Sequence, residues 1–431
     1  MKINKLYIKK IKGTYDILPN NFKIINLIIK KIKFIINKYR LKQVDTPILE
    51  YTKLYKIILK KDKEITNNQI FSFKDKLNNN KLSLKPENTS GIIRLILENK
   101  LLIKNNYQKL WYFSNIFRHE KPQKWRYRQF FQLGIEIFKF NKFKSDIELL
   151  KISYDIFKKL KLISKIFLEI NFIGNLKERY KYTKKLRYFF SKFILKFNKI
   201  ELNKFYYNPL KILDNNFYTN KILKKIPKIF KYLKKKSLNK FKNIIRDLKI
   251  YQIPYKINPY LIRGLSYYNN LIFEWKIKKK SFISICGGGR YDYLFKNINK
   301  KIKAGGLSIG IERLILLFKK YNKNIFKFKL NIYIICINNK FKFYCYILSE
   351  ILRNLNFKII LNFVNKKNIN NLIKNSILFK SNFIIFIGKK EIYNSFITIK
   401  KLYYIKNNKK IYKINFNKIK YFFINKILNK K

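Results

Sequence analysis

The chain has 431 residues, and its 99 Lys and Arg against 23 Asp and Glu give a net charge of +76. Its 47% hydrophobic and 17% aromatic residues can form a large core, which excludes a purely disordered basic chain and favours two or three domains. A single histidine, His119, excludes a histidine-rich metal site, and three cysteines without CxxC spacing exclude a zinc ribbon or a disulfide framework. No uncharged stretch is long enough for a membrane helix and no signal peptide is evident, so we expect a cytoplasmic protein without a membrane partner.

The positive charge by itself predicts a nucleic-acid-binding protein, but a second interpretation is stronger. Lys, Ile, Asn, Phe and Tyr are abundant together, and A/T-only codons specify all five. Selection for phosphate binding would raise Lys and Arg without raising Ile and Phe. We therefore interpret most of the charge as codon bias, and we treat Gly, Arg, Glu, Pro and Trp as the informative residues.

The first predicted element is an amphipathic helix after Pro19, because apolar residues recur at helical spacing from Phe22 to Tyr39. Residues 43–49, interrupted by Pro47, indicate a strand. Two antiparallel strands joined by a polar turn are predicted over 109–138. The Lys/Asn-rich stretch from about 165 to 255 is predicted to be an inserted, mostly helical domain.

The chain from about 328 is predicted to be a separate small α/β unit. Its apolar runs indicate strands at Asn331–Ile337, Phe357–Phe363 and Phe383–Ile387, with a helix at Phe343–Leu355. We therefore predict one domain over 1–325, which includes the insertion, and a second over 328–431.

The strand pair at 109–138 carries polar residues on one face. Alternate residues of a strand share a face, so Arg118 and Glu120 fall together, as do Gln132, Gly134 and Glu136. The opposite row of the second strand is apolar and is predicted to face the core. A glycine between Gln132 and Glu136 leaves room for a ligand, whereas the alternative is a salt-bridge ladder on the surface.

This region, FRHEKPQKWRYRQFFQLGIEIF, resembles motif 2 of the class II aminoacyl-tRNA synthetases in the form found in the histidyl-tRNA synthetase family. Further blocks resemble the same family in order and cover nearly the whole chain: KGTYDILP (Lys12–Pro19), DTPILE (Asp45–Glu50), LKPENTSGIIRL (Leu84–Leu95), NPLKILD (Asn208–Asp214), LIRGLSYYNNLIFEW (Leu261–Trp275), CGGGRYDYL (Cys286–Leu294), AGGLSIGIERLILLF (Ala304–Phe318) and FIIFIGKKE (Phe383–Glu391). The resemblance implies an α+β fold, with a class II antiparallel-sheet catalytic core, a helical insertion and a C-terminal α/β anticodon-binding domain.

The family activates L-histidine with ATP to histidyl-adenylate and then transfers it to the 3′ end of tRNA(His). Displacement at phosphorus needs fixed positive charge more than it needs a covalent nucleophile. The resemblance implies a homodimer formed through Asp45–Glu50. It also implies Mg²⁺ with ATP, without a dedicated protein metal site beyond Glu312. The implied catalytic residues are Arg118 and Arg263, and the implied ATP-binding residues are Arg118, Glu120, Arg263, Glu312 and Arg313.

The resemblance also implies a pocket in which carboxylates and phenols hold the ammonium group and the imidazole of histidine. His119 is interpreted as a residue of the motif 2 loop near ATP. The tRNA acceptor end is assigned to Arg126, Arg128 and Gln129. The implied histidine-binding residues are Glu87, Asn88, Thr89, Gln132, Glu136, Tyr267, Tyr268 and Tyr291.

Three positions depart from the family pattern. Ser266 stands where the family usually has Asp, and this predicts weaker support for the turn that carries Arg263. Asn88 and Trp125 each stand where Gly is usual, so we expect a positive φ at Asn88 and altered contact with the tRNA acceptor end at Trp125.

Two other functions remain open from the sequence. The family includes a non-aminoacylating paralogue, the regulatory subunit of ATP phosphoribosyltransferase, which binds histidine but lacks the anticodon domain and has usually lost the second catalytic Arg. Arg263 and the long C-terminal region argue against it. A non-specific basic nucleic-acid coat would explain the charge but not the ordered blocks.

Overall fold

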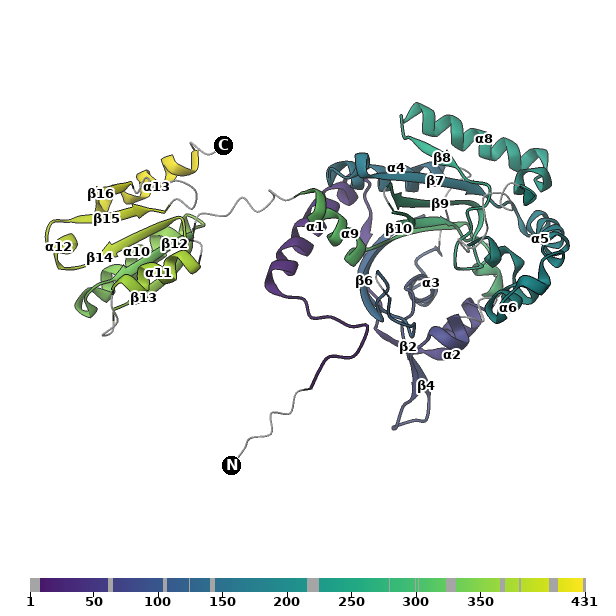
Figure 1. Cartoon of the computed structure of the whole chain (residues 1–431), viewed down its shortest axis with the longest axis horizontal. Helices are drawn as coiled ribbons and strands as arrows, with labels where there is room; N and C mark the ends of the chain where they lie inside the picture. Colours follow the sequence, from purple (N-terminus) through teal and green to yellow (C-terminus); the bar gives the residue numbers. More distant parts are fainter. Residues whose placement is uncertain are drawn as a thin grey trace. The chain divides into compact units, whose positions relative to one another are not determined.

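The structure is a computed structural model in which the chain forms two compact units, Met1–Asn322 and Lys323–Lys431 (Figure 1). The predicted domain boundary between 325 and 328 lies outside the described residues. The structure describes residues 8–60, 65–103, 107–123, 125–139, 144–214, 225–278, 280–298, 300, 302–322, 331–364, 369–379, 381–402 and 410–428.

The first unit is built on an eight-stranded sheet with the order β1-β5-β6-β11-β10-β9-β7-β8. The six central strands β5, β6, β11, β10, β9 and β7 pair with one another in antiparallel fashion. At the two edges, β1 pairs with β5 and β8 pairs with β7 in parallel. The strands are β1 (Lys42–Gln43), β5 (Gln108–Phe117), β6 (Gln129–Phe138), β7 (Ile166–Phe172), β8 (Tyr255–Ile257), β9 (Asn269–Ile277), β10 (Lys280–Arg290) and β11 (Ala304–Gly310).

The predicted strand pair at 109–138 corresponds to β5 and β6, in which Tyr112 lies opposite Gly134 and Ser114 opposite Gln132. The apolar row of β6 is buried, as its alternation predicts; Leu133 and Ile135 are examples. Helices pack on that face of the sheet, including α4 (Lys144–Lys159), whose Ser153 accepts a hydrogen bond from Trp275 of β9. The polar row of β6 therefore faces the opposite side.

Helix α1 spans Pro19–Lys38 and confirms the predicted amphipathic helix; proline at its first position suits a helix start. Its buried stripe of isoleucines packs against α4 and α9 (Ile311–Tyr321). In Figure 1, α1 and α9 lie outside the curve of β6, whereas α3 (Thr89–Glu98) lies inside it. The inner side of the sheet is thus the side available for a site.

Residues 43–49 do not form the single strand that their pattern indicates. They contribute to β1 and to β2 (Leu49–Tyr51), which belong to different sheets. Pro47 lies between them, and a proline cannot donate to a strand ladder. The second sheet has the order β2-β4-β3 and is completed by β3 (Ser72–Lys74) and β4 (Lys81–Leu84), with α2 (Thr52–Ile58) beside it.

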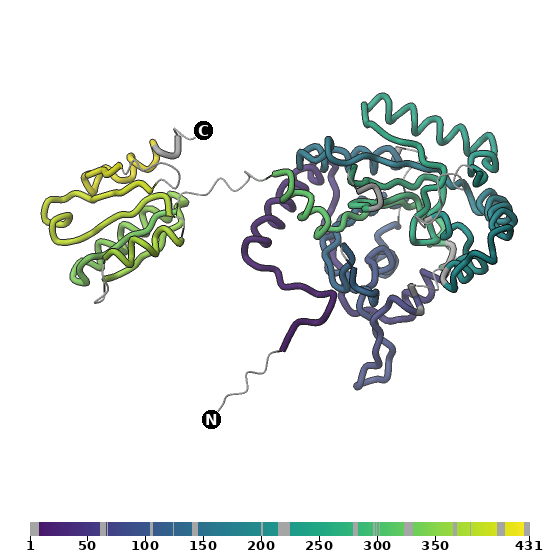
Figure 2. The backbone as a smooth tube through the Cα atoms, viewed as in Figure 1, coloured from purple at the N-terminus to yellow at the C-terminus, as the bar shows by residue number. Residues whose placement is uncertain are grey.

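The stretch 165–255 begins and ends in the main sheet, because β7 and β8 are neighbouring strands at one edge. The helices between them start with α5 (Leu176–Ser191) and end with α8 (Lys235–Ile250), with α6 (Lys199–Tyr207) between. Figure 2 traces this teal part of the chain along one side of the first unit. The helical segment is therefore shorter at both ends than the sequence predicts.

The second unit is a five-stranded sheet with the order β13-β12-β14-β15-β16. Its faces are covered by helices, with Ile332 and Ile334 in one core and Tyr333 and Ile335 in the other. The three predicted strands and the helix are present, and further elements complete the unit. The elements are β12 (Asn331–Cys336), α10 (Lys342–Asn354), β13 (Lys358–Phe363), α11 (Ile369–Leu378), β14 (Phe383–Ile387), α12 (Lys389–Tyr393), β15 (Phe396–Lys401), β16 (Ile411–Asn415) and α13 (Ile419–Leu428).

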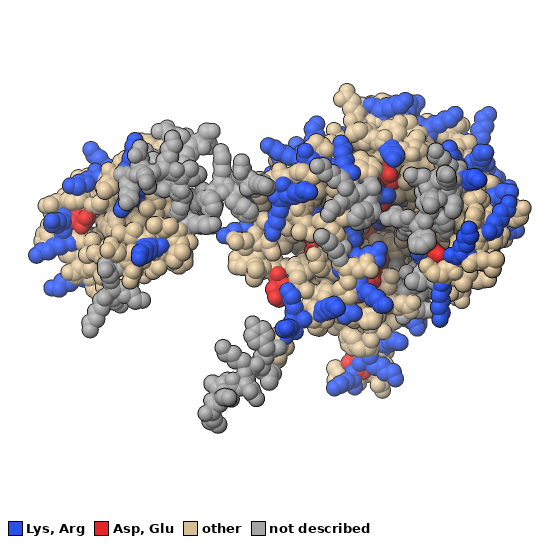
Figure 3. Space-filling view, in the orientation of Figure 1, with Lys and Arg blue, Asp and Glu red and all other residues tan. Residues whose placement is uncertain are grey.

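Lysine and arginine are spread over the visible surface of each unit rather than gathered in one patch (Figure 3). A dedicated nucleic-acid surface concentrates its positive charge on one face or along one helix. The dispersed distribution therefore agrees with codon bias as the main source of the charge.

Candidate active site

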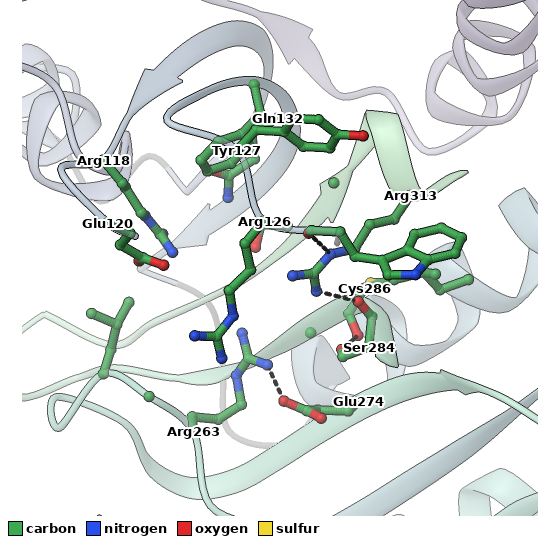
Figure 4. Close-up of a pocket in the computed structure, with 18 of the residues that line it drawn as sticks. Arg118, Glu120, Arg126, Tyr127, Gln132, Arg263, Glu274, Ser284, Cys286 and Arg313 are labelled. Atoms are coloured by element: carbon green, nitrogen blue, oxygen red, sulfur yellow. Dashed lines mark hydrogen bonds and ion pairs between the residues drawn. The ribbon is translucent and has the colours of Figure 1, made fainter. Parts of the chain in front are cut away.

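A cavity of about 490 Å³ lies on the inner side of the main sheet (Figure 4). It is lined by the β5–β6 loop, the start of β6, strands β9 to β11, the start of α9 and the turn that begins at Arg263. Two lysines of the insertion, Lys204 and Lys211, also line it. Residues distant in sequence thus meet in one polar space.

Arginines dominate this space. Figure 4 shows the guanidinium groups of Arg118, Arg126 and Arg263 directed toward the same region, and Arg313 lies beside them. Such a group of cations at close range binds a polyanion, because planar guanidinium groups match phosphate oxygens. Glu120 and Gln132 line the same cavity.

Arg263 is held from two sides. Its Nη1 donates to Oε1 of Glu274 on β9, and its guanidinium lies over the ring of Tyr268, 5.7 Å from the centroid. Burial is the largest single influence and works to lower the pKa of Arg263, but the Glu274 carboxylate together with Tyr268 and Tyr267 outweighs it and raises the pKa. A Cβ atom at Gly287 would overlap Nη1, so only glycine leaves this position open to the guanidinium.

Arg118 lies immediately after β5 and lines the cavity. Its Nε donates to the carbonyl of Pro86 at 3.0 Å, and its guanidinium packs over the Phe130 ring at 5.4 Å. The hydrogen bond fixes one edge of the Arg118 guanidinium group. These two contacts orient the side chain into the cavity. Neither of them is with a carboxylate.

Arg313 lies in the first turn of α9, where the helix dipole favours anions. Its Nε donates to the carbonyl of Trp125 at 3.1 Å and its Nη1 to that of Ser284 at 2.7 Å. Burial lowers the pKa of Arg313, and the positive charges of Arg126 and Arg118 lower it further. An anion among these cations would relieve their mutual repulsion.

Glu312, next to Arg313, lines the cavity but is already engaged within the protein. Its Oε1 accepts hydrogen bonds from the hydroxyl of Tyr15 and from the backbone N–H of Phe131, the latter at 2.7 Å. Burial raises the pKa of Glu312, and these donors oppose the shift. The N-terminal segment is tied to α9 through this carboxylate.

The predicted histidine pocket contains a buried carboxyl group, Glu136, which is 2% exposed. It accepts hydrogen bonds from the Thr89 hydroxyl at 2.9 Å and from the Tyr291 hydroxyl. Burial raises the pKa of Glu136 to about 8, and the two hydroxyl groups moderate the shift. Gly306 on the neighbouring strand gives this side chain its space, since a Cβ atom there would overlap the carboxylate.

Tyr267, Tyr268 and Tyr291 form an aromatic group beside Glu136. The rings of Tyr267 and Tyr268 are 4.7 Å apart and those of Tyr267 and Tyr291 are 5.8 Å apart. Burial raises the pKa of all three phenols, so they remain neutral hydrogen-bonding groups. The buried Oε1 of Gln132 has no hydrogen-bond partner in the described part of the chain, and it is available to a ligand.

Glu87 caps α3 in this structure. Its carboxylate accepts from the backbone N–H groups of Thr89 at 2.8 Å and Ser90 at 3.0 Å. Asn88 has φ −105°, so the expectation of a positive φ is wrong. Its backbone is therefore in a region that any residue can adopt, and its side chain is held by the Thr46 hydroxyl, which donates to Oδ1 at 2.7 Å.

The loop between β5 and β6 is folded back on itself. Arg126 lines the cavity, whereas Arg128 donates to the carbonyl of Glu120 at 3.1 Å, and Gln129 starts β6. His119 is exposed, with its ring against Phe71 at 5.0 Å. Of the three residues assigned to the tRNA acceptor end, only Arg126 lines the cavity.

Trp125 has φ +76°, in the left-handed region that favours glycine. Its side chain lines the cavity, and its carbonyl accepts the hydrogen bond from Arg313. A bulky residue in this conformation carries backbone strain. The strain is located where the family pattern has Gly.

The space predicted above Gly134 is occupied. The ring of Tyr112, on the opposite residue of β5, fills it, and a Cβ atom at Gly134 would overlap that ring. The physical reason is that a cross-strand neighbour reaches over a residue without a side chain. Gly134 therefore accommodates a protein side chain.

Sequence reasoning missed Glu274, Ser284, Gln69 and the two insertion lysines. Glu274 had a signal, because acidic residues are scarce and it stands within a strand pattern of apolar residues. Lys204 and Lys211 had no such signal, because lysine is abundant throughout the chain. Within the described ranges, His, Cys, Asp and Glu form no group of three that could hold a metal, and no helix is long and apolar enough to cross a membrane.

Comparison with known proteins gives the same family along almost the entire chain. A family model described as Histidyl-tRNA synthetase matches residues 13–314, and one described as Anticodon binding domain matches residues 331–426. A curated histidine–tRNA ligase of Buchnera aphidicola subsp. Schizaphis graminum (strain Sg) is 38% identical over 401 residues, 92% of this chain and 93% of that protein. That of Malacoplasma penetrans (strain HF-2) is 34% identical over 428 residues, 97% and 99% of the two chains.

Solved structures agree with these relatives. The structure of apo histidyl-tRNA synthetase from S. aureus has a TM-score of 0.77 and 26% identity, covering 96% of this chain and 99% of that one. Histidyl-tRNA synthetase from Nostoc sp. PCC 7120 has a TM-score of 0.68 at 18% identity, with 97% and 99% covered, and shows the shared fold.

Proposed function

The chain belongs to the histidyl-tRNA synthetase family, and we propose from this that it is a histidine–tRNA ligase whose active site is the arginine-lined cavity. ATP and L-histidine are its small substrates and tRNA(His) is its acceptor. The single observation that carries the site assignment is the meeting of Arg118, Arg263 and Arg313 in one space.

The cavity suits adenylate formation. An oxygen of the histidine carboxylate attacks the α-phosphorus of ATP, and the bond to the bridging oxygen of pyrophosphate breaks. We assign Arg118 and Arg263 to the α-phosphate and to the charge that develops there, because fixed guanidinium groups stabilise such charge without reorganisation. Arg313 at the start of α9 binds the remaining phosphates, and Glu120 lies toward the adenine.

The buried group around Glu136 suits recognition of the imidazole. A carboxyl group and neighbouring phenols offer both donors and acceptors to the two ring nitrogens, which an apolar pocket cannot do. Glu87 and the unpartnered Oε1 of Gln132 accept from the substrate ammonium. On binding, the Glu87 carboxylate would exchange the backbone N–H donors of Thr89 and Ser90 for the substrate ammonium group.

Mg²⁺ is proposed to accompany ATP, where it neutralises phosphate charge. Mg²⁺ is usually held by one or two carboxylates together with substrate phosphates. Glu312 is the carboxylate proposed for this role, because it lines the cavity next to Arg313 at the start of α9.

The tRNA is proposed to approach the cavity with its acceptor end near Arg126, and residues 331–426 to bind the anticodon. Arg128 and Gln129 remain proposed contacts that need movement of the β5–β6 loop. The two lysines of the insertion that line the cavity supply further phosphate contacts.

A homodimer is proposed through the segment around Asp45–Glu50. Ile48, Leu49 and Tyr51 are exposed there at 43%, 48% and 59%. Adjacent exposed apolar side chains are a feature of protein interfaces. Sedimentation equilibrium would give twice the monomer mass, and replacement of Leu49 by Asp would shift it toward the monomer.

A cytoplasmic location is also proposed. None of the three cysteines forms a disulfide, which agrees with it.

The regulatory paralogue is the second candidate. The match of 331–426 to an anticodon-binding model and the presence of Arg263 favour the ligase. ATP–pyrophosphate exchange measured with each amino acid in turn separates the candidates. Exchange that depends on histidine alone supports the ligase, absence of exchange favours the paralogue or a basic coat, and exchange with another amino acid indicates a different specificity.

A further inference from the structure

The first turn of α5 lies beside the turn that carries Arg263. Strand β7 runs into α5 through Gly174, whose carbonyl accepts from the backbone N–H of Asn270 at 2.9 Å. The N–H of Ile173 donates back to the carbonyl of Asn270 at 2.8 Å. The start of the inserted helices is therefore hydrogen-bonded to the start of β9, immediately after residues 263–268.

Arg179 of α5 makes a more specific contact. Its Nη1 donates to the carbonyl of Ser266 at 2.9 Å and to that of Tyr268 at 2.7 Å. These two carbonyls belong to the same turn as Arg263, and the Tyr268 ring lies against the Arg263 guanidinium. A guanidinium nitrogen has two hydrogens in one plane, so a single Nη can fix two carbonyl groups at once.

Arg179 projects from a rigid support. Asn175 and Glu178 form a capping box, with Glu178 N–H donating to Oδ1 of Asn175 at 3.1 Å and Asn175 N–H donating to Oε2 of Glu178 at 2.7 Å. The buried Glu178 also accepts from the N–H of Lys234 at 2.7 Å and from the Ser237 hydroxyl at 3.0 Å. The helix end is thus fixed both to itself and to α8.

We propose that Arg179 is a positioning residue for adenylation, which acts by holding the main chain at Ser266 and Tyr268 and thereby the direction of Arg263. The inference rests on the proposed function and adds a residue of the insertion to the catalytic machinery. It also accounts for the departure at Ser266: the turn is supported through its carbonyl groups by a side chain from another segment, not by an aspartate of its own.

Loss of these two hydrogen bonds is expected to lower the rate of adenylation strongly. A misplacement of about 1 Å in a catalytic group costs roughly 100-fold in rate. Loss of the two hydrogen bonds frees the turn but leaves Arg263 in the chain. We therefore expect kcat for histidine-dependent ATP–pyrophosphate exchange to fall by about 10- to 100-fold in Arg179→Met. The KM for ATP should stay within about threefold, since Arg118 and Arg313 are untouched.

The matched control is Arg187→Met, two turns further along α5. Arg187 is exposed and donates to the carbonyl of Tyr206 at 3.1 Å, and neither residue lines the cavity. Both variants lose one helix arginine and one charge, so a difference between them isolates the contact with the turn. All rates are measured below the thermal midpoint of each variant. Arg179→Lys, which keeps a cationic donor on a shorter side chain, should recover part of the kcat.

The outcomes are distinct. If the wild-type chain lacks histidine-dependent exchange, the proposed function fails and the role of Arg179 fails with it. If the wild type is active and Arg179→Met keeps kcat within twofold of Arg187→Met, the positioning role is overturned and the proposed function stands. If Arg179→Met does not fold, Arg179→Lys decides: a folded Lys variant with several-fold lower kcat supports the role, and one with wild-type kcat overturns it.

Discussion

Glu274 of β9 accepts a hydrogen bond from Nη1 of Arg263 and forms an ion pair with it. The carboxylate holds one edge of the guanidinium fork and leaves the rest directed into the cavity (Figure 4). The same carboxylate lies 3.7 Å from Nζ of Lys276, so its charge is balanced on both sides. The ion pair thus sets the direction of the Arg263 guanidinium.

Replacement of Arg263 by Ala should lower the rate of adenylation by about 100- to 1,000-fold, because a fixed charge at the developing phosphorane is lost. Histidine binding should remain measurable, since the groups around Glu136 are intact. ATP–pyrophosphate exchange gives the rate and equilibrium dialysis gives the affinity. Glu274→Gln, which keeps the shape but weakens the pairing, should show a smaller loss. An unchanged rate in Arg263→Ala would exclude its catalytic role.

Glu136 predicts a pH dependence of stability. Its pKa is raised from 4.5 to about 8 by burial, so the folded chain retains a proton that the unfolded chain has released. The stabilising contribution is complete below pH 4.5 and is lost as the pH rises through 8, at up to ~1.4 kcal/mol per pH unit. Glu136→Gln cannot titrate there. Asp146, whose pKa burial raises to about 6, is present in both proteins and cancels in the comparison.

The measurement is urea unfolding of the wild type and Glu136→Gln at several pH values from 5 to 8. The free energy of unfolding of the wild type should decline relative to the variant as the pH rises. The groups that face this carboxyl are Thr89, Tyr291 and Glu87, and none of them changes in the variant. A constant difference across the range would show that Glu136 does not retain its proton.

Trp125 predicts a difference in stability between two substitutions. An L-residue at φ +76° is strained by about 1–2 kcal/mol, and glycine removes most of that cost. Trp125→Gly should therefore be about 1 kcal/mol more stable than Trp125→Ala, because both lose the indole and only glycine relieves the backbone. Thermal and urea unfolding supply the comparison. Equal stability of the two variants would mean that the loop relaxes to another conformation.

Glu312 predicts a change in metal requirement. Glu312→Gln should raise the Mg²⁺ concentration for half-maximal exchange on the order of tenfold, because a carboxylate oxygen near the phosphates is lost. Tyr15→Phe is the matched control, as it removes a donor to the same carboxylate but keeps the charge. Its Mg²⁺ requirement should shift less. A Glu312→Gln enzyme with the wild-type Mg²⁺ titration would place the metal elsewhere.

Local periodicity was sufficient to predict α1, β5 and β6, because each has a long, regular apolar pattern. It failed at 43–49, where Pro47 separates two short strands of different sheets. It also failed in the second unit, where β15 (FITIKK) and β16 (IYKIN) are short and share their Lys and Ile with the loops. In so biased a composition, strand and loop residues no longer differ enough to be separated.

The site was predictable where rare residues carried it and unpredictable where it depended on pairing between distant strands. Arg118, Arg263 and Arg313 stand out against the lysine background, and the structure brings them into one cavity. The position of β11 between β6 and β10 is a long-range feature that no local pattern contains. Gly134 was assigned to ligand space for a different reason: the pairing of β5 with β6 was predicted, but not the register that places the ring of Tyr112 over Gly134.

Three glycines of the sheet leave space for the side chain of another residue: Gly134 for Tyr112, Gly287 for Arg263 and Gly306 for Glu136. A methyl group at any of them would displace a side chain of the site or of its floor. A genome that drifts toward A/T-only codons replaces glycine codons readily, since these are G-rich. Codon bias can therefore change many residues around the cavity, but a side chain at any of these three glycines would require Tyr112, Arg263 or Glu136 to move.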